Sequence, residues 1–279
     1  MKWIFAFLLA VLIFGGAALF TYNNFIHPEI AMRAERNSGS SPLPTPDVGL
    51  PEFRAAEKLK TDGKLIEARA ALTAFLQRYP SGPHADDAQD LLGDVNISIL
   101  LSDYPAPEKE QYIVRSGDVL ARIAAKFKST PELIMRTNNL SGTMLRIGQK
   151  LLISHPGFSI LVQRKTKLLY LLDREHFFKR YKIREEKLPG NPAPKINTRV
   201  AEVMAWKDGK RISIASPEFL NSTRWIRLNL PGYVIYSQPD DSHQVLDVPP
   251  PAQGFGLAAS DVEELSGLVN TRTAVTITQ

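Results

Sequence analysis

The chain has 279 residues, of which 44% are hydrophobic and 23% charged, so it is ordinary for a globular protein and long enough for two or three modest domains. It contains no cysteine, which excludes disulfides, thiolate metal sites and cysteine nucleophiles. A net charge of +5 suits an anionic surface such as a cell wall or lipid head groups, whereas the lack of a compact basic motif interleaved with aromatic residues argues against nucleic acid as a partner.

The chain begins with a hydrophobic run. After Lys2 the residues are apolar through Tyr22, and as a helix this run would span roughly 30 Å of hydrocarbon. Because Lys2 lies on the short leading side, we expect the rest of the chain outside the cytoplasmic membrane. We predict residues 1–22 as an uncleaved signal anchor, with a signal peptide cleaved near residues 16–18 as the alternative. Residues 23–50 are predicted to be a linker, whose Ser, Pro and Gly from Asn37 onward favour an unfolded chain.

Residues 51–104 have the spacing of helices. Two sets of apolar residues lie three and four apart, one before Gly63 and one before Pro80: Phe53, Ala56 and Leu59, then Ala68, Leu72 and Phe75. The second set resembles half of a tetratricopeptide repeat, and residues 85–93 resemble the first helix of another. We predict a short tetratricopeptide-like hairpin that acts as a spacer, with recruitment of an envelope protein partner as the alternative. Residues 103–110 are a second linker.

Over the whole of residues 111–154, the apolar spacing, the helix-capping residues and the turn residues indicate the same small fold. A short strand at 112–114 is followed by the turn 116–118, whose polar side chains are expected to cap a helix with an apolar face. A second helix begins at Ser129 or Thr130, has Pro131 in its first turn and ends at residues 138–139. A strand at 150–153 completes a strand-helix-helix-strand unit of about 45 residues, near the lower limit for independent folding.

This segment resembles the LysM domain, a family known for binding the N-acetylglucosamine backbone of peptidoglycan and chitin. The matching positions are Tyr112, Val114, residues 116–118, Leu120, residues 123–124, Phe127, Leu133, residues 138–140 and residues 147–151. The resemblance implies a shallow groove between two loops, formed by Gly117, Asp118, Val119 and Leu120 on one side and by Asn139, Leu140, Met144 and Leu145 on the other. For Leu120 and Leu145 a place in the core is the alternative, because both also fit the apolar stripe.

Residues 158–279 change to short runs of β-branched and aromatic residues. We predict strands at 158–163, 167–173, 176–183, 199–206, 211–215, 225–230, 233–237 and 274–278. A short helix at 262–269 is expected to be capped by Ser260 and Asp261, and the proline-rich residues 188–197 are expected to form an irregular loop. Together these elements predict a mostly antiparallel sheet with one late helix, which makes the whole chain an α+β multidomain protein.

The order of these elements resembles the L,D-transpeptidase catalytic domain, which cross-links peptidoglycan stem peptides through a cysteine thiolate. The resemblance is carried by residues 160–162 with 168–171, 228–235, 261–269 and 273–277. The family's Ser-His-Gly-Cys-Ile-Arg-Leu signature falls on residues 251–257. There Ala252 replaces the histidine, Gly254 the nucleophile and Gly256 the arginine, while Tyr236 replaces the histidine of a preceding Ile-His-Gly-Thr element.

That chemistry needs a thiolate and a neighbouring histidine, so we predict a degenerate, non-catalytic domain. The alternative is an enzyme acting on stem peptides with a non-cysteine nucleophile, for which Ser237, His243 and Asp240 or Asp241 are the candidates, although closeness in sequence says little about triad geometry. The five histidines lie far apart in the sequence, so we expect no metal site and no cofactor.

The sequence therefore predicts a membrane-anchored envelope protein with most of its mass in the periplasmic or extracytoplasmic space. Its predicted partners are peptidoglycan glycan strands, held by the LysM domain, and the cytoplasmic membrane, held by the N-terminal helix. An excess of Lys and Arg in residues 164–227 is explained by a solvated strand face. The alternative is that the inherited cleft binds anionic stem peptides or an active transpeptidase.

Overall fold

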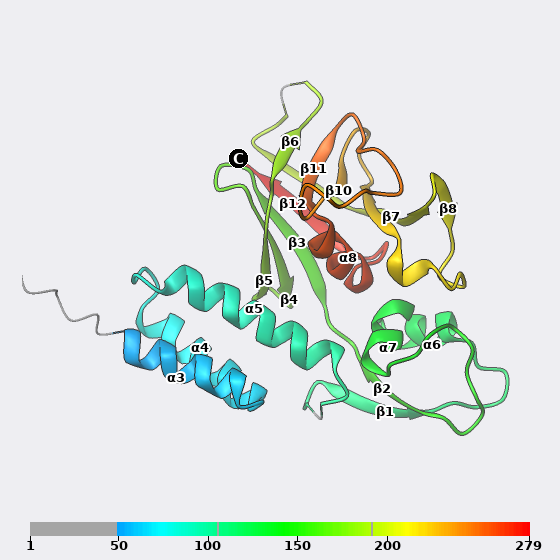
Figure 1. The fold of residues 1–279 in the computed structure, drawn as a ribbon, viewed down its shortest axis with the longest axis horizontal. Helices are drawn as coiled ribbons and strands as arrows, with labels where there is room; N and C mark the ends of the chain where they lie inside the picture. The colour runs from blue at the N-terminus through cyan, green and yellow to red at the C-terminus, as the bar shows by residue number, and fades with distance from the viewer. Residues whose placement is uncertain (1–48, 105, 191) are drawn as a thin grey trace, which may run out of the picture. The chain divides into compact units, whose positions relative to one another are not determined.

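The computed structural model describes residues 49–104, 106–190 and 192–279 (Figure 1). The predicted signal anchor at 1–22 and all but the last two residues of the predicted linker at 23–50 lie outside this part of the chain. Within it, no helix is both long enough and apolar enough to cross a membrane.

The described part of the chain begins with the helices α3 (Leu50–Thr61), α4 (Leu65–Arg78) and α5 (Ala85–Leu101). The helical interpretation is confirmed, and the two predicted apolar sets share one core, in which Ala56, Ala68 and Leu72 are completely buried. Gly63, at a φ of +74°, ends the first helix in a conformation that glycine adopts without strain. The assignment of this hairpin to the tetratricopeptide repeats stays a prediction.

The next four elements are β1 (Lys109–Ile113), α6 (Leu120–Lys126), α7 (Pro131–Thr137) and β2 (Lys150–Ser154). The two strands pair antiparallel with Tyr112 opposite Leu151, so the predicted strand-helix-helix-strand order is confirmed. The Thr130 hydroxyl caps α7 by accepting a hydrogen bond from the Leu133 amide at 3.0 Å. The predicted side-chain cap of α6 is wrong, because the N-cap is Val119 and no side chain bonds the first turn.

The remaining strands form one large sheet. Their bounds are β3 (Phe158–Gln163), β4 (Leu168–Asp173), β5 (His176–Lys182), β6 (Glu185–Lys187), β7 (Lys195–Lys207), β8 (Lys210–Ile212), β9 (Thr223–Leu228), β10 (Val234–Gln238), β11 (Gly254–Ala258) and β12 (Ala274–Thr278). The strand order is β5-β4-β3-β12-β7-β9-β10-β11-β6, with β8 attached to β7. Only the β3–β12 and β10–β11 pairs are parallel among the described strands, so the mostly antiparallel prediction is confirmed.

Three predictions about this region need correction. The expected loop at 188–197 is shorter, because β7 begins at Lys195, where it pairs with the C-terminal strand β12. No strand was predicted at β6 or β11, yet the two pair with each other antiparallel. The helix α8 (Ala259–Leu268) begins earlier than expected and has no side-chain cap; the Ser260 amide instead donates to the Asp240 carboxylate at 3.2 Å.

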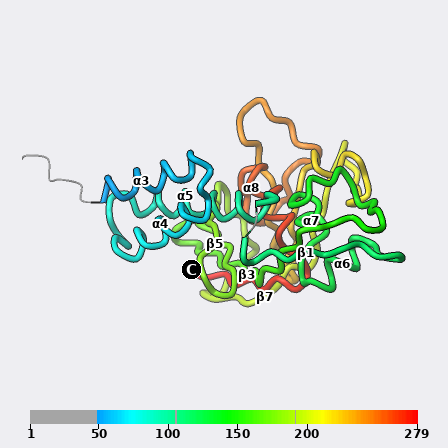
Figure 2. Tube along the Cα trace, turned by 90° about the horizontal axis from the view of Figure 1, so that it is seen from below, coloured from blue at the N-terminus to red at the C-terminus, as the bar shows by residue number. Residues whose placement is uncertain are grey.

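Helix α5 connects the helical hairpin to the sheet. It packs along β5, where the Arg180 guanidinium reaches Asp86 and Asp90, each at 2.6 Å, and the Asn96 amide donates to the Phe178 carbonyl at 2.8 Å. Figure 2 shows the three helices at one end of the described chain and the β1–α6–α7–β2 unit at the other. The sheet lies between them with α8 packed on β9 and β10.

Candidate functional site

The first rim of the predicted groove is the loop between β1 and α6. Gly117 is exposed at a φ of +83°, and a side chain added there would meet no atom within 4 Å. The Asp118 carboxylate accepts hydrogen bonds from the Arg115 amide and the Tyr112 hydroxyl, both at 2.8 Å. These two bonds lower the pKa of Asp118, so the carboxylate is ionised and locked in the turn.

Val119 and Leu120, next along this rim, point to different surroundings. The Val119 side chain is 49% exposed, whereas Leu120 is 2% exposed and belongs to the core of the β1–α6–α7–β2 unit. Leu120 therefore shapes the rim from below, and its side chain is not available to a ligand. For this residue the core alternative holds.

The second rim is the segment between α7 and β2. Asn139 is exposed at a φ of +51°, a conformation that asparagine tolerates better than most residues. Leu140 and Leu145 are half-buried against the core, and Met144 between them is 91% exposed. Paired backbone hydrogen bonds, from Gly148 to Val114 at 2.8 Å and from Val114 to Gln149 at 2.9 Å, tie the end of this segment to the β1 strand.

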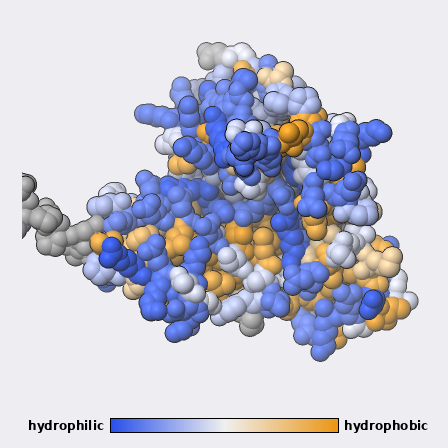
Figure 3. Space-filling model, viewed as in Figure 1, coloured by the Kyte–Doolittle hydropathy of each residue, from blue (hydrophilic) through white to orange (hydrophobic). Residues whose placement is uncertain are grey.

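Exposed apolar side chains concentrate in this unit. Five large hydrophobic residues are exposed in the described chain, and all but Val245 lie here: Ile113, Val119, Met144 and Ile147. Figure 3 shows hydrophobic residues reaching the surface among hydrophilic ones in this part of the visible face. Large apolar side chains that a closed core leaves in solvent mark a surface that a ligand can cover.

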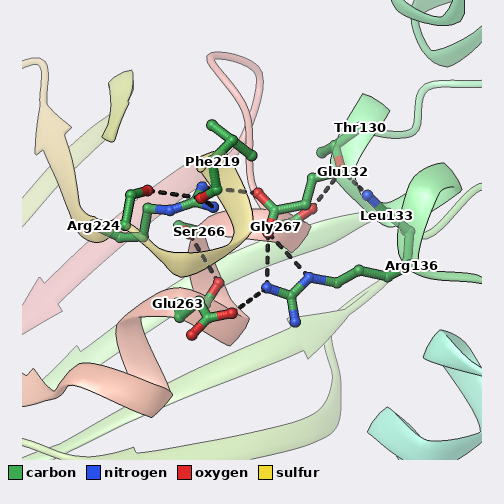
Figure 4. Close-up of polar contacts among 10 residues, drawn as sticks. Thr130, Glu132, Leu133, Arg136, Phe219, Arg224, Glu263, Ser266 and Gly267 are labelled. Atoms are coloured by element: carbon green, nitrogen blue, oxygen red, sulfur yellow. Dashed lines mark hydrogen bonds and ion pairs between the residues drawn. The ribbon is translucent and has the colours of Figure 1, made fainter. Parts of the chain in front are cut away.

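The unit is held to the sheet through α7, by a buried ionic cluster. The Glu132 carboxylate lies 3.0 Å from the Arg224 guanidinium of β9 and 3.0 Å from Arg136, which in turn reaches Glu263 of α8 at 2.6 Å (Figure 4). The Thr130 hydroxyl also donates to the Gly267 carbonyl. None of the predicted groove residues takes part, so the rims stay free while α7 fixes the orientation of the unit.

The Glu132–Arg224 pair is fully enclosed. The Arg224 side chain is 0% exposed and that of Glu132 5%, and burial lowers the pKa of Arg224 against the opposing effect of Glu132. The guanidinium also lies 3.7 Å from the Phe219 ring. A charge this deeply buried is stable only with its partner in place, because desolvation of a lone ion costs several kcal/mol. This pair was not predictable from local pattern, since its members are 92 residues apart in the chain.

The second predicted site, around Gly254, is closed. Gly254 is buried at a φ of +141°, and a Cβ added there would lie closer than 3.0 Å to the Val234 carbonyl oxygen. At Gly256 an added Cβ would strike the Gln238 side chain at 2.7 Å. Neither position accepts a side chain without movement of its neighbours, and the first would require the β10 backbone to move.

Tyr236 fills the space beside these glycines. Its side chain is 0% exposed, and its hydroxyl donates to the Glu185 carboxylate of β6 at 2.7 Å. Gln238 donates to the same carboxylate at 2.6 Å. Burial and the neighbouring carboxylate raise the pKa of Tyr236, which stays neutral and acts as a packing and hydrogen-bonding group. Of the four positions predicted to be degenerate, Tyr236, Gly254 and Gly256 lie in the strands β10 and β11. Ala252 is exposed in the loop before β11.

The alternative nucleophile set does not assemble. Ser237 is 1% exposed, and its hydroxyl donates to the Arg224 carbonyl at 2.9 Å. His243 is exposed, and its backbone amide donates to Asp241, while Asp240 accepts from the start of α8. No hydrogen bond links Ser237 to His243 in the described residues. The same residues contain no cluster of His, Asp and Glu that could hold a metal ion.

Comparison with known proteins identifies one family and one group of similar folds. Residues 112–154 match the LysM domain family. Solved L,D-transpeptidases are similar in structure. The enzyme from Mycobacterium smegmatis is 8% identical, with 48% of this chain and 65% of that one covered and a TM-score of 0.31. An Enterococcus faecium L,D-transpeptidase mutant is 16% identical, with 48% and 55% covered and a TM-score of 0.29. No curated protein matched the chain.

These comparisons agree with both sequence resemblances. The β1–α6–α7–β2 unit is a LysM domain, and the structural neighbours are L,D-transpeptidases. The chain spans about two thirds of the first transpeptidase, with 65% of it covered. At TM-scores near 0.3 this likeness does not indicate the activity of the chain.

Proposed function

We propose that this protein binds the glycan strands of peptidoglycan through the two rims of its LysM domain and makes or breaks no bond in the cell wall. The observation that carries the proposal is the exposure of Val119 and Met144, 49% and 91%, on the two loops that flank a closed domain core. Apolar side chains held in solvent on a small rigid domain are suited to the apolar faces of sugar rings, while loop backbone groups are suited to the acetamides.

The expected affinity of one such groove is low. A small interface leaves little surplus after the cost of association has been met. Two features of the chain reduce that cost or add to retention. The ionic cluster around Glu132 fixes the domain before it binds, so less freedom is lost on binding. We infer a location in the cell envelope, where a membrane anchor at residues 1–22 would keep the groove near the wall at high effective concentration.

The absence of cysteine argues against thiolate chemistry in the C-terminal sheet. Transpeptidation through a thiolate requires a cysteine and space for an acyl group. The position that matches the nucleophile holds Gly254, which has the Val234 backbone against it. We infer that this part of the sheet is a structural support for the LysM domain and is not an active site.

Sedimentation of the full-length chain with purified sacculi tests the binding proposal. Changing Val119 and Met144 together to Ser should lower the bound fraction by about tenfold, because both apolar contacts are lost. The matched control is Val245→Ser, which removes an equally exposed apolar side chain, 92% exposed, from a loop of the sheet. Equal retention of the double variant and the control would refute the assigned groove.

A second measurement addresses the claim that no bond is made. The full-length chain is incubated with soluble wall fragments that carry stem peptides, and their masses are recorded over time. We expect an unchanged spectrum. A mass change that persists after Ser237→Ala would show chemistry at another residue, and one that disappears would restore the serine alternative. Either mass change contradicts the proposal.

A further inference from the structure

A small cavity lies between the LysM domain and the C-terminal sheet, away from both predicted sites. Its volume is about 180 Å³. One wall is the α6–α7 loop with Lys128 and Ser129, and another is the α8–β12 connection with Asn270, Arg272 and Thr273. A volume below the roughly 300 Å³ of the smallest drug-sized sites suits a small ion or a single functional group.

The lining of this cavity carries positive charge without compensation. Lys128 and Arg272 both line it, and neither forms an ion pair with any residue that the structure describes. No Asp or Glu is among the lining residues. The nearby Asp173 carboxylate is engaged elsewhere, since it accepts from the Gly157 amide at 2.7 Å and pairs with Arg174 at 3.3 Å. Two free cations beside one small cavity attract an anion.

Two buried hydroxyls in the lining also have hydrogen atoms to donate. Ser129 is 4% exposed, and its hydroxyl has no hydrogen-bond partner. Thr273 is also 4% exposed, and its hydroxyl oxygen accepts from the Asn270 amide at 3.0 Å but donates to no acceptor in the described residues. A hydroxyl that has no acceptor within the protein can donate to an acceptor bound beside it.

We propose that this cavity binds a phosphate group. A phosphate carries one to two negative charges and several strong acceptor oxygens, which match the two cations and the two hydroxyls. A carboxylate or a phosphodiester has one charge and two free oxygens and would leave donors unused. Because Ser129 belongs to the LysM domain and Arg272 to the C-terminal sheet, a bound phosphate would be held by both. The phosphate could be the free ion or a phosphomonoester, and the probes below distinguish the two.

Titration of the full-length chain by isothermal calorimetry tests this site, with inorganic phosphate, glycerol phosphate, dimethyl phosphate and acetate as separate probes. We expect saturable binding of inorganic phosphate or of glycerol phosphate, at least about tenfold tighter than binding of acetate or dimethyl phosphate. Tighter binding of inorganic phosphate identifies the free ion as the ligand, and tighter binding of glycerol phosphate identifies a monoester.

Variants assign the binding to this cavity. Arg272→Gln and Lys128→Asn should each weaken phosphate binding by roughly tenfold, and asparagine is tolerated at the φ of +55° that Lys128 adopts. Ser129→Ala removes a hydroxyl that bonds nothing in the protein, so it should weaken binding several-fold without changing the melting temperature. The matched control Lys182→Gln removes one exposed charge from β5 and should bind phosphate as the unmodified chain does.

Three results would overturn the proposal: no saturable phosphate binding, acetate binding as tight as phosphate binding, or equal weakening by Arg272→Gln and Lys182→Gln. Loss of sacculus retention in the Val119 and Met144 variant with phosphate binding intact would separate this site from the glycan groove.

Discussion

The LysM rim at Gly117 and the sheet position Gly254 contain the same residue type for opposite reasons. Both glycines have a positive φ, +83° and +141°. Around Gly117 there is open space, and the glycine serves a turn that leaves the rim accessible. Around Gly254 the Val234 backbone lies where a Cβ would be, and the glycine allows two strands to approach. One glycine therefore belongs to an accessible surface and the other to a packed interior.

The two regions also differ in what covers them. Apolar side chains of the LysM loops, such as Met144, remain in solvent although the domain has its own core. In the sheet, Tyr236 and β6 cover the glycines and satisfy their polar groups within the protein. Positions that match a known active-site motif thus do not form a cleft when their neighbours are large and well bonded, whereas exposed apolar loops remain available to a ligand.

The largest effect is expected from placing a cysteine at Gly254. Gly254→Cys places a Cβ against the Val234 carbonyl and requires a φ that cysteine rarely adopts. We expect a loss of at least about 4 kcal/mol in the free energy of unfolding, measured by chemical denaturation. Gly142→Cys is the control, since an added Cβ there meets nothing within 4 Å. A Gly254→Cys protein as stable as the control would show that the region is open.

The next largest effect is expected where the LysM domain is attached to the sheet. Glu132→Gln leaves the buried Arg224 without its counter-charge and should cost about 3–5 kcal/mol. Glu202→Gln is the comparison, because its partners Arg211 and Arg227 are about half exposed, and such pairs contribute roughly 0–1 kcal/mol. Similar denaturation midpoints for the two variants would mean that the cluster does not hold the LysM domain in place.

Within the LysM domain, two truncations distinguish a residue that stabilises the core from one that is proposed to contact the glycan. Leu120→Ala removes a side chain that is 2% exposed, so we expect a loss of about 3 kcal/mol in stability. Met144→Ala removes one that is 91% exposed and should change stability by less than about 0.5 kcal/mol while it reduces sacculus binding. If Met144→Ala were the more destabilising change in thermal denaturation, Met144 would be a core residue and the open rim would be lost.

The smallest effect on stability is expected at Asp261 of α8, the helix that packs on the sheet. Burial raises its pKa from 3.8 to about 6, against the attraction of Lys179. A carboxyl with a raised pKa contributes stability below pH 4 and loses it as the pH rises through 6. Asp261→Asn should therefore be more stable than the unmodified chain at pH 7.5, by about 1 kcal/mol after allowance for partial exposure, and equal to it at pH 4. A difference that does not change with pH would contradict this account.

The elements that were predictable from the sequence are those fixed by local pattern. The LysM helices have apolar residues at helical spacing and Thr130 and Pro131 at the start of α7, so their order followed directly. Strands β3 and β12 were predicted with their observed bounds for the same reason. The eight groove residues came from the resemblance, and their role in binding stays a prediction.

What sequence reasoning missed depends on distant partners. Strand β11 contains two glycines and forms because it lies parallel to β10 and antiparallel to β6. The early start of β7 depends on pairing with β12 at the far end of the chain. The Glu132–Arg224 pair joins two domains, and within its own segment Glu132 is only a residue of the first helical turn. No local pattern encodes contacts of this kind.

Retention of the full-length chain on two bead-coupled preparations of one wall separates glycan binding from peptide binding. In the first preparation the stem peptides are removed and the glycan strands are left intact. In the second the glycan is cut to disaccharides and the peptide cross-links are left. We expect retention on the first preparation and loss on the second, because the LysM rims contact sugar rings and not peptides. Retention that follows the peptides would contradict it.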